Sequence, residues 1–173
     1  RVIEIIEKQA NKYDLKLMLS QKMKNNISLK NLYGLHQLEN AELSKRVISY
    51  LNDKKIINVS DKQILFGIRN TVWFGRFQII KKKPTVIFDV AHNKSSIESL
   101  MKSFKYFRKK NNFKKTYLLC AFERNKKIKS KLKYYENLFD YIICSETNIR
   151  DSMSVNDIAL IFRNKKKIII KPD

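Results

Sequence analysis

Residues 84–93 read PTVIFDVAHN, an apolar run that begins with proline and ends in Asp, His and Asn set among small residues. The β-branched and aromatic side chains from Thr85 to Phe88 favour a strand. Asn93 and Ser95 are both suited to the N-terminus of a helix, and a helical pattern follows them. The stretch therefore predicts a strand that leads into a helix, with Asp89 and His92 in the turn between them.

The alternation of strand and helix continues to the end of the chain. Strand-like runs and helical patterns follow each other at 95–108, 116–121, 127–138, 141–145, 155–162 and 167–170. Strands separated by helices predict right-handed crossovers and a largely parallel sheet that includes residues 85–88. Ligands bind beyond the carboxyl ends of such strands, so the residues after Phe88, Ala121 and Ser145 are candidates for a binding site.

The residues before this region have a different character. Their patterns predict a helix, a short strand and a second helix at 2–13, 15–19 and about 36–52. A third helix is expected after Ser60, which has Gln63 in the capping-box position, and it should end near Gly67. We expect a domain boundary at 70–73.

The charge of this 173-residue chain, +21 at pH 7, raises the question of nucleic-acid binding. Most of the basic residues are lysines scattered among Asn and Ile, with only short runs at 81–83 and 165–167. Arginine, the preferred residue for base edges and phosphates, is uncommon, and no nucleic-acid motif accompanies the charge. We therefore predict no specific nucleic-acid partner, and a positive field that attracts anionic substrates.

The remaining composition favours a reduced, cytoplasmic protein. Cys120 and Cys144 lie inside apolar runs, as buried strand thiols do, and the sequence offers no partners for a metal site. No apolar run is long enough to span a bilayer, and no secretory signal is recognisable. Because the chain begins at Arg1 rather than Met, we interpret it as part of a longer protein.

Two shorter motifs precede the opening stretch. Residues 34–41 read GLHQLENA, in which the amide of Asn40 can donate and accept at once, as the edge of an adenine requires. Residues 73–76 read WFGR, in which the planar fork of Arg76 suits phosphate oxygens. The alternatives are a solvent-facing Asn on a capped helix, and a surface Arg beside a packed Trp.

Asp89 and His92 have similar alternatives. An Asp after a strand can accept hydrogen bonds from ribose hydroxyls, and a His there can orient a carboxylate or a phosphate. Alternatively, Asn93 or Ser95 simply caps the helix and His92 lies on the surface.

Together the three segments resemble the G-x-H-Q-x-x-N-A, W-x-G-R and P-x-x-x-x-D-G-A-H-N signatures of folylpolyglutamate and dihydrofolate synthases, in the Mur ligase superfamily. Residues 120–126 and Arg150 resemble later loops of that family more loosely. The resemblance implies an α/β protein in which residues 1–72 are the tail of a P-loop ATPase central domain. Residues 73–173 would be a Rossmann-like, mostly parallel C-terminal domain, the glutamate ligase domain, truncated at its end.

The resemblance also implies a reaction and its participants. ATP would phosphorylate the terminal glutamate carboxylate of tetrahydrofolate, and the amine of L-glutamate would displace phosphate from the acyl phosphate. Asn40 would contact adenine, Arg76 the phosphates and Asp89 the ribose, while His92 would lie near the incoming glutamate. Mg²⁺ would be held by ligands in a missing N-terminal part, and the enzyme would be a cytoplasmic monomer.

Two departures limit this reading. Val90 replaces the family's Gly, and would be strained if that position required a positive φ. The three glycines form no G-x-x-G-K-[ST] phosphate loop, so we expect this chain alone to be inactive.

Two other functions stay open. The first is a dihydrofolate synthase or a bifunctional enzyme, which uses dihydropteroate and cannot be distinguished here because pterin recognition lies upstream. The second is a non-catalytic basic module that binds anions or RNA.

Overall fold

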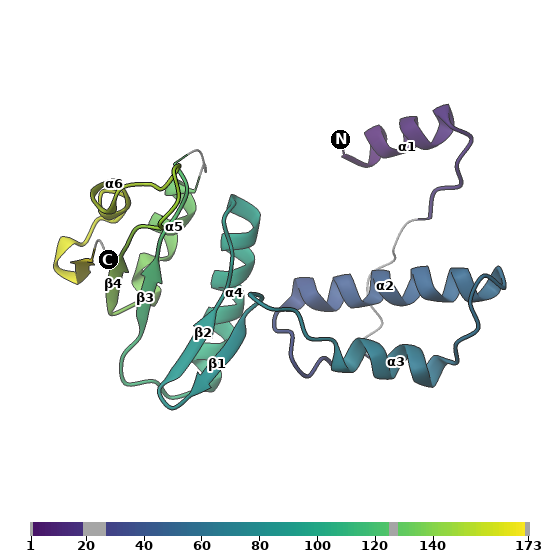
Figure 1. Ribbon diagram of the computed structural model, residues 1–173, viewed down its shortest axis with the longest axis horizontal. Helices are drawn as coiled ribbons and strands as arrows, with labels where there is room; N and C mark the ends of the chain where they lie inside the picture. Colours follow the sequence, from purple (N-terminus) through teal and green to yellow (C-terminus); the bar gives the residue numbers. More distant parts are fainter. Residues whose placement is uncertain (1, 19–26, 125–127, 172–173) are drawn as a thin grey trace. The chain divides into compact units, whose positions relative to one another are not determined.

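The computed structural model describes residues 2–18, 27–124 and 128–171 (Figure 1). The chain divides into two compact units, one made of residues 1–29 and 38–70 and the other of residues 30–37 and 71–173. Among the described residues, no helix has both the length and the apolar character needed to cross a membrane.

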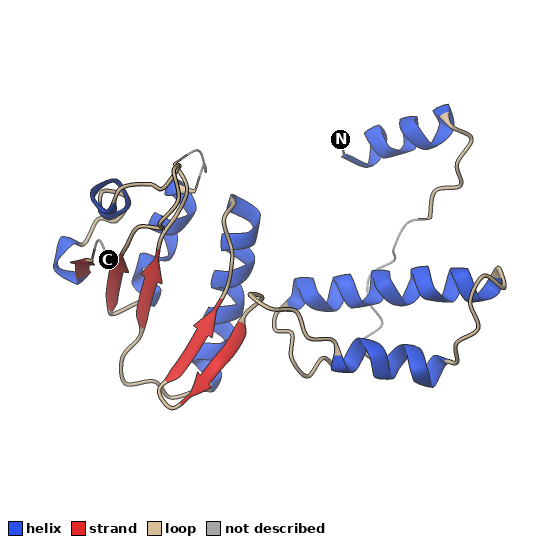
Figure 2. Ribbon diagram, viewed as in Figure 1, coloured by secondary structure: helices blue, strands red, loops and turns tan. Residues whose placement is uncertain are grey.

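The first unit is helical. Its helices are α1 (Val2–Lys12), α2 (Leu35–Asp53, whose first residues belong to the second unit) and α3 (Asp61–Asn70). Helices α2 and α3 lie side by side (Figure 2) and share a small core of Ala41, Ile64 and Ile68. The side-chain amide of Asn52 closes the loop between them, because it both donates to and accepts from the backbone of Val59 at 3.0 Å.

The predicted capping box at the start of α3 is confirmed. The side-chain oxygen of Gln63 accepts from the backbone N–H of Ser60 at 2.8 Å, and the Ser60 hydroxyl accepts from the Gln63 N–H at 3.4 Å. The predicted end near Gly67 is wrong, since α3 continues to Asn70. Ile68 is buried in the small core, and its packing outweighs the cost of about 0.5–1 kcal/mol that a glycine imposes within a helix.

The short strand predicted at 15–19 is also wrong for its described residues, 15–18. Leu15–Met18 have no regular secondary structure, and Leu19 lies outside the described residues. Leu15, Leu17 and Met18 are exposed. An apolar run becomes a strand only when a neighbouring strand pairs with its backbone groups.

The second unit opens with a β-hairpin of β1 (Gln78–Lys82) and β2 (Thr85–Phe88). The two strands pair in antiparallel fashion, with Gln78 opposite Phe88. The prediction that residues 85–88 belong to the parallel sheet is therefore wrong. The two-residue turn at 83–84 reverses the chain at once, and so short a connection joins antiparallel strands only.

After the hairpin the predicted alternation is confirmed. Helix α4 (Lys94–Lys110) leads to strands β3 (Tyr117–Cys120), β4 (Tyr141–Cys144) and β5 (Ile168–Ile170), which form a parallel sheet in the order β3-β4-β5. The crossovers carry α5 (Lys129–Tyr135) with a 3-10 turn at Glu136–Leu138, and α6 (Val155–Ala159) with a 3-10 turn at Lys165–Lys167. The architecture is α/β (Figure 2), as the sequence predicted.

The main core lies between this sheet and its helices. Ile97 and Met101 from α4, Leu132 from α5 and Ile158 from α6 pack in one cluster with Ile142 from the sheet. The opposite face of the sheet is open: Tyr117 and Leu119 on β3 are 55% and 68% exposed. Cys120 and Cys144 are free, buried thiols, as predicted.

Candidate functional site

Asp89 lies at the end of β2 and is held by two backbone amides. Its Oδ2 accepts from the N–H of Phe77, and its Oδ1 accepts from the N–H of Ala91, both at 2.8 Å. The first bond joins the end of β2 to the segment before β1. Each carboxylate oxygen keeps a further lone pair, so Asp89 can still accept from a ligand hydroxyl.

Phe77 needs this support because its backbone is in the left-handed region, with φ of +45°. Such a conformation is unfavourable for a bulky residue and persists only where its surroundings enforce it. The Phe77 ring is 2% exposed and packs against Tyr33 and Phe107, at centroid distances of 5.4 and 5.5 Å. Aromatic packing and the Asp89 carboxylate together fix the backbone immediately after Arg76.

Gly75 fixes the backbone on the other side of Arg76. Its carbonyl accepts from the N–H of Val90 at 3.0 Å, and its N–H donates to the side-chain oxygen of Gln78 at 3.0 Å. Gly75 has φ of +70°, and a Cβ at this position would lie 2.8 Å from Val90 Cγ1. Only a glycine therefore permits the close approach of Val90.

The replacement of the family's glycine by Val90 does not strain the backbone. Among the described residues other than glycine, positive φ occurs at Asp14, Lys55 and Phe77. Val90 is not among them, so its β-branched side chain carries no strain of that kind. Its methyl groups instead lie over Gly75.

Arg76 is thus anchored on both sides next to Asp89. Its side chain is half-buried, while the preceding aromatic residues Trp73 and Phe74 are 65% and 76% exposed. The alternative of an Arg beside a packed Trp does not describe this chain. The W-x-G-R segment and the D-x-A-H-N segment, which are separate in the sequence, form one structural site.

His92 and the N-terminus of α4 complete the arrangement. Asn93 is the N-cap residue: its Oδ1 accepts from the Ser96 N–H at 2.9 Å, and the Ser96 hydroxyl accepts from the Asn93 N–H at 3.0 Å. His92 is exposed, and its Nδ1 lies 2.9 Å from the carbonyl of Val90. When Nδ1 carries the proton and donates it to that carbonyl, Nε2 presents a lone pair to solvent beside the positive end of the helix.

Of the four predicted site residues, the structure brings together Arg76, Asp89 and His92. Asn40 lies on α2 in the first unit, where its side chain is exposed. Gly34 of the same motif belongs to the second unit and has φ of +106°. A Cβ on Gly34 would collide with the hydroxyl of Ser103 on α4, which explains why a glycine stands there.

The sequence did not single out Ser152, which organises the carboxyl edge of the parallel sheet. Its hydroxyl accepts from the Thr147 N–H at 2.9 Å, and its carbonyl accepts from Arg124 Nε at 2.9 Å. Arg124 follows β3 in a loop that showed only a loose resemblance, and its residues 125–127 lie outside the described part of the chain. A small polar residue such as Ser152 gives no pattern that sequence reasoning can detect.

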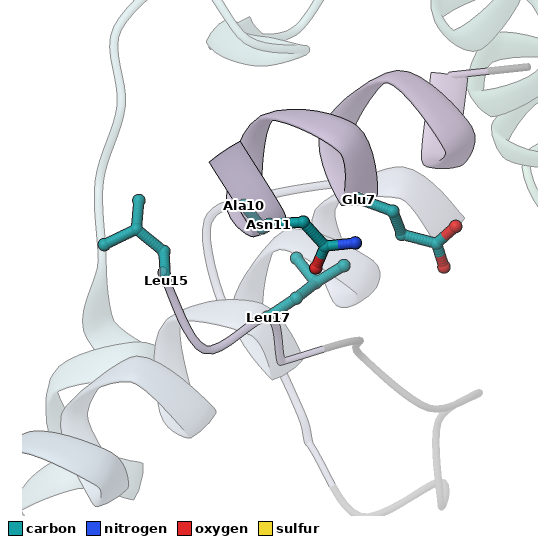
Figure 3. A pocket seen from close by; sticks show the side chains of 5 residues that line it. All are labelled: Glu7, Ala10, Asn11, Leu15 and Leu17. Carbon is teal, nitrogen blue, oxygen red and sulfur yellow. The ribbon is translucent and has the colours of Figure 1, made fainter. Parts of the chain in front are cut away.

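The described residues offer no metal cluster at these positions. No group of three or more His, Cys, Asp or Glu side chains in the described part of the chain could hold a metal ion. A pocket beside α1 (Figure 3) is lined by Glu7, Ala10, Asn11, Leu15 and Leu17. All of these except Ala10 are exposed, and none belongs to the cluster around Asp89.

Comparison with known proteins identifies the family. Residues 75–173 match the family model described as Mur ligase, glutamate ligase domain. The match covers more than half of the chain and begins at Gly75, at the start of the cluster described above. The chain belongs to the Mur ligase family.

Similar proteins agree with this assignment. The Mur ligase chain is 35% identical over 75 residues to a dihydrofolate synthase/folylpolyglutamate synthase of Bacillus subtilis, an alignment that covers 43% of this chain and 17% of the relative. The resemblance to folylpolyglutamate and dihydrofolate synthases is thereby confirmed. The chain therefore matches only a small part of the length of that relative.

Solved structures show the same fold at low sequence identity. A folylpolyglutamate synthase of Mycobacterium tuberculosis, complexed with ADP and AMPPCP, has a TM-score of 0.83 at 16% identity, covering 99% of this chain and 43% of that one. A bifunctional folylpolyglutamate synthase/dihydrofolate synthase with Mn, AMPPNP and L-glutamate bound has a TM-score of 0.74 at 19% identity, covering 97% and 42%.

Proposed function

We propose that the protein containing this chain is a folylpolyglutamate synthase, which joins L-glutamate to the terminal glutamate carboxylate of tetrahydrofolate at the expense of ATP. The observation that carries the proposal is the pair of hydrogen bonds that join the D-x-A-H-N segment to the W-x-G-R segment and to the residue after it, from Val90 to Gly75 and from Phe77 to Asp89. Family membership and the ligands named for the two similar structures support it.

In this proposal each site residue has a separate role. The guanidinium of Arg76 binds phosphate oxygens of the nucleotide through charge-assisted hydrogen bonds. The free lone pairs of Asp89 accept from the ribose hydroxyls. Nε2 of His92 faces the incoming glutamate, and Asn40 contacts the adenine. The chain is then a C-terminal ATPase tail at 1–72 followed by a glutamate ligase domain at 73–173.

The reaction itself is a two-step acyl transfer. The folate carboxylate attacks the γ-phosphorus of ATP and releases ADP, which gives an acyl phosphate. The amine of L-glutamate then attacks the acyl carbon, and the tetrahedral intermediate loses phosphate to form the amide.

The test supplies the full-length protein with three substrates, namely radiolabelled L-glutamate, ATP and tetrahydrofolate. Label should enter the folate fraction only when ATP and the folate are both present. Residues 1–173 alone should incorporate none, because a phosphate loop is absent from their sequence. Absence of ATP-dependent incorporation by the full-length protein would contradict the proposal.

A dihydrofolate synthase or a bifunctional enzyme is the second candidate, because the name of the Bacillus subtilis relative includes both activities. Competition between dihydropteroate and tetrahydrofolate for labelled glutamate distinguishes the possibilities. A folylpolyglutamate synthase labels only the folate, a dihydrofolate synthase only the pteroate, and a bifunctional enzyme both.

A non-catalytic basic module that binds anions or RNA is the alternative from another class, and only the net charge of +21 favours it. It predicts RNA binding that weakens steeply with salt. It also predicts that this binding is indifferent to substitution of Asn40 and Asp89.

A further inference from the structure

The loop after β3 and the loop after β4 are joined to each other at the carboxyl edge of the parallel sheet. The backbone N–H of Arg124 donates to the carbonyl of Asp151 at 2.9 Å, and the N–H of Met153 donates to the carbonyl of Phe122 at 2.7 Å. These bonds fix the position of each loop relative to the other. Ligands of such sheets bind beyond the carboxyl ends of the strands, which is where these loops lie.

The guanidinium of Arg124 is held in place by one of its three nitrogens. Its Nε donates to the carbonyl of Ser152 at 2.9 Å. Ser152 is 9% exposed, and its hydroxyl accepts from the Thr147 N–H at 2.9 Å, so the anchoring carbonyl belongs to an ordered turn. The Arg124 side chain is exposed, and its two terminal nitrogens have no partner among the described residues. A guanidinium presents its donors as a planar fork, which can bind a carboxylate through two parallel hydrogen bonds.

No acidic side chain in the described part of the chain neutralises Arg124, since the ion pairs found there involve other residues. In the loop after β4, the Glu146 carboxylate accepts from the N–H of Val155 at 2.9 Å. Asp151 bonds to Arg124 through its backbone carbonyl, and its own side chain is exposed. An arginine that is oriented but lacks an anion suits an anionic ligand, because binding then costs little conformational entropy.

Arg124 lies at the same edge of the second unit as the cluster around Asp89. Helix α4 returns the chain between β2 and β3, so the two strands run in the same direction (Figure 2). The loops that follow these strands also rest on one core, because Ala91 and Phe122 both pack against it. Arg124 and His92 therefore face ligands that approach the same edge.

We propose that Arg124 binds the side-chain carboxylate of the incoming L-glutamate and thereby selects a dicarboxylic amino acid. This role rests on the proposed function, in which only the amine of L-glutamate reacts and its side-chain carboxylate stays free. The fork of Arg124 binds that carboxylate through two charge-assisted hydrogen bonds. The side chain of L-glutamine has one acceptor oxygen and an NH₂ group, which would meet a donor of the fork. The site therefore rejects the amide, because it leaves one donor unpaired.

The experiment measures the binding of L-glutamate and of L-glutamine to the full-length protein by isothermal titration calorimetry. The ATP analogue AMPPNP and either tetrahydrofolate or dihydropteroate are present, so that the other substrate sites are filled without turnover. Arg124→Ala should weaken the binding of L-glutamate by about 10- to 100-fold, as expected for the loss of hydrogen bonds to a charged group. The binding of L-glutamine and of AMPPNP should not change. Arg163→Ala, which removes an exposed guanidinium from the same unit, should affect none of the three.

Arg124→Lys separates recognition of the carboxylate from support of the loop. Lysine keeps the positive charge but not the planar fork, so this variant should recover only part of the affinity for L-glutamate. If Arg124 only supported the loop after β3, its loss would weaken the binding of both amino acids equally. The preference for L-glutamate over L-glutamine is therefore the measurement that a structural role does not change.

Two results would overturn the proposal. In the first, Arg124→Ala binds L-glutamate as tightly as wild type; in the second, it loses affinity for both amino acids by the same factor. Either result leaves the proposed function intact if wild type incorporates labelled glutamate. A wild-type protein that binds L-glutamate through Arg124 but incorporates none contradicts the proposed function alone. A wild-type protein that binds neither amino acid contradicts both.

Discussion

The backbone N–H of Phe77, the residue directly after the WFGR segment, donates a hydrogen bond of 2.8 Å to the carboxylate of Asp89 in the second signature segment. The bond stabilises a phenylalanine whose φ is +45°. Asp89 therefore has a structural role that is separate from any contact with a nucleotide. A substitution at this position tests both roles.

Asp89→Ala should lower the free energy of unfolding by about 1–3 kcal/mol, because it leaves the amides of Phe77 and Ala91 without their acceptor. Asp89→Asn should cost less, since its amide oxygen still accepts one of the two bonds. Urea denaturation measures both values. Asp151→Ala is the matched control, because that side chain is exposed and should be close to neutral. Equal stability of wild type and Asp89→Ala would contradict the structural role.

Gly75→Ala should destabilise the protein by about 1–2 kcal/mol from the left-handed backbone alone, with an added cost from the contact with Val90. In the double variant Gly75→Ala with Val90→Ala, the contact is relieved and only the backbone cost remains. A double-mutant cycle in urea should therefore give a favourable coupling between the two substitutions. Strict additivity would mean that the two residues do not touch in solution.

Gly67→Ala should raise the free energy of unfolding by about 0.5–1 kcal/mol, because Gly67 lies inside α3. Nothing lies within 4 Å of the place its Cβ would occupy, so the methyl group meets no obstacle. Thermal denaturation of wild type and variant measures the change. A destabilised variant would show that α3 ends before this residue.

Glu98 should make the stability depend on pH. Its carboxylate lies 2.6 Å from the Lys131 ammonium and 2.9 Å from that of Lys102, and these contacts lower its pKa from 4.5 to about 2. Because the folded pKa lies below the unfolded one, the stabilisation is complete above pH 4.5 and is lost as the pH falls towards about 2.

The measurement is the difference in Tm between wild type and Glu98→Gln across that pH range. The difference should be largest at the upper end, shrink towards the lower end, and become smaller in high salt, because the pair is at the surface. A difference that does not change with pH would mean that these ion pairs do not form in solution.

Regular features of the second unit could be predicted from the sequence. Strands β3, β4 and β5 are short apolar runs, each separated from the next by a helical pattern, and such a pattern has few alternative folds. In the first unit, the capping box of Ser60 and Gln63 could also be predicted, because its two residues are one helical turn apart.

Features that depend on contacts between distant residues could not be predicted. Residues 77–80 and 85–88 are both β-rich runs, separated by a basic turn with Pro84, but β2 is also followed by a helix, as in a parallel crossover. Only the pairing of β2 with β1 reveals the hairpin. The approach of Val90 to Gly75 and the bond from Phe77 to Asp89 join residues with no shared periodicity. The motifs named Arg76, Asp89 and His92 as candidates, and their roles toward a nucleotide stay predictions.

The most direct test of the central claim is kcat/KM for ATP-dependent glutamate incorporation into tetrahydrofolate by the full-length protein with Arg76→Ala. Loss of a charge-assisted contact to phosphate, worth about 1.5–3 kcal/mol, predicts a decrease of about 10- to 100-fold. Arg163→Ala, which removes an exposed guanidinium from the same unit, should leave the activity unchanged. An Arg76→Ala enzyme that is folded and as active as wild type would contradict the assignment of this site to the nucleotide.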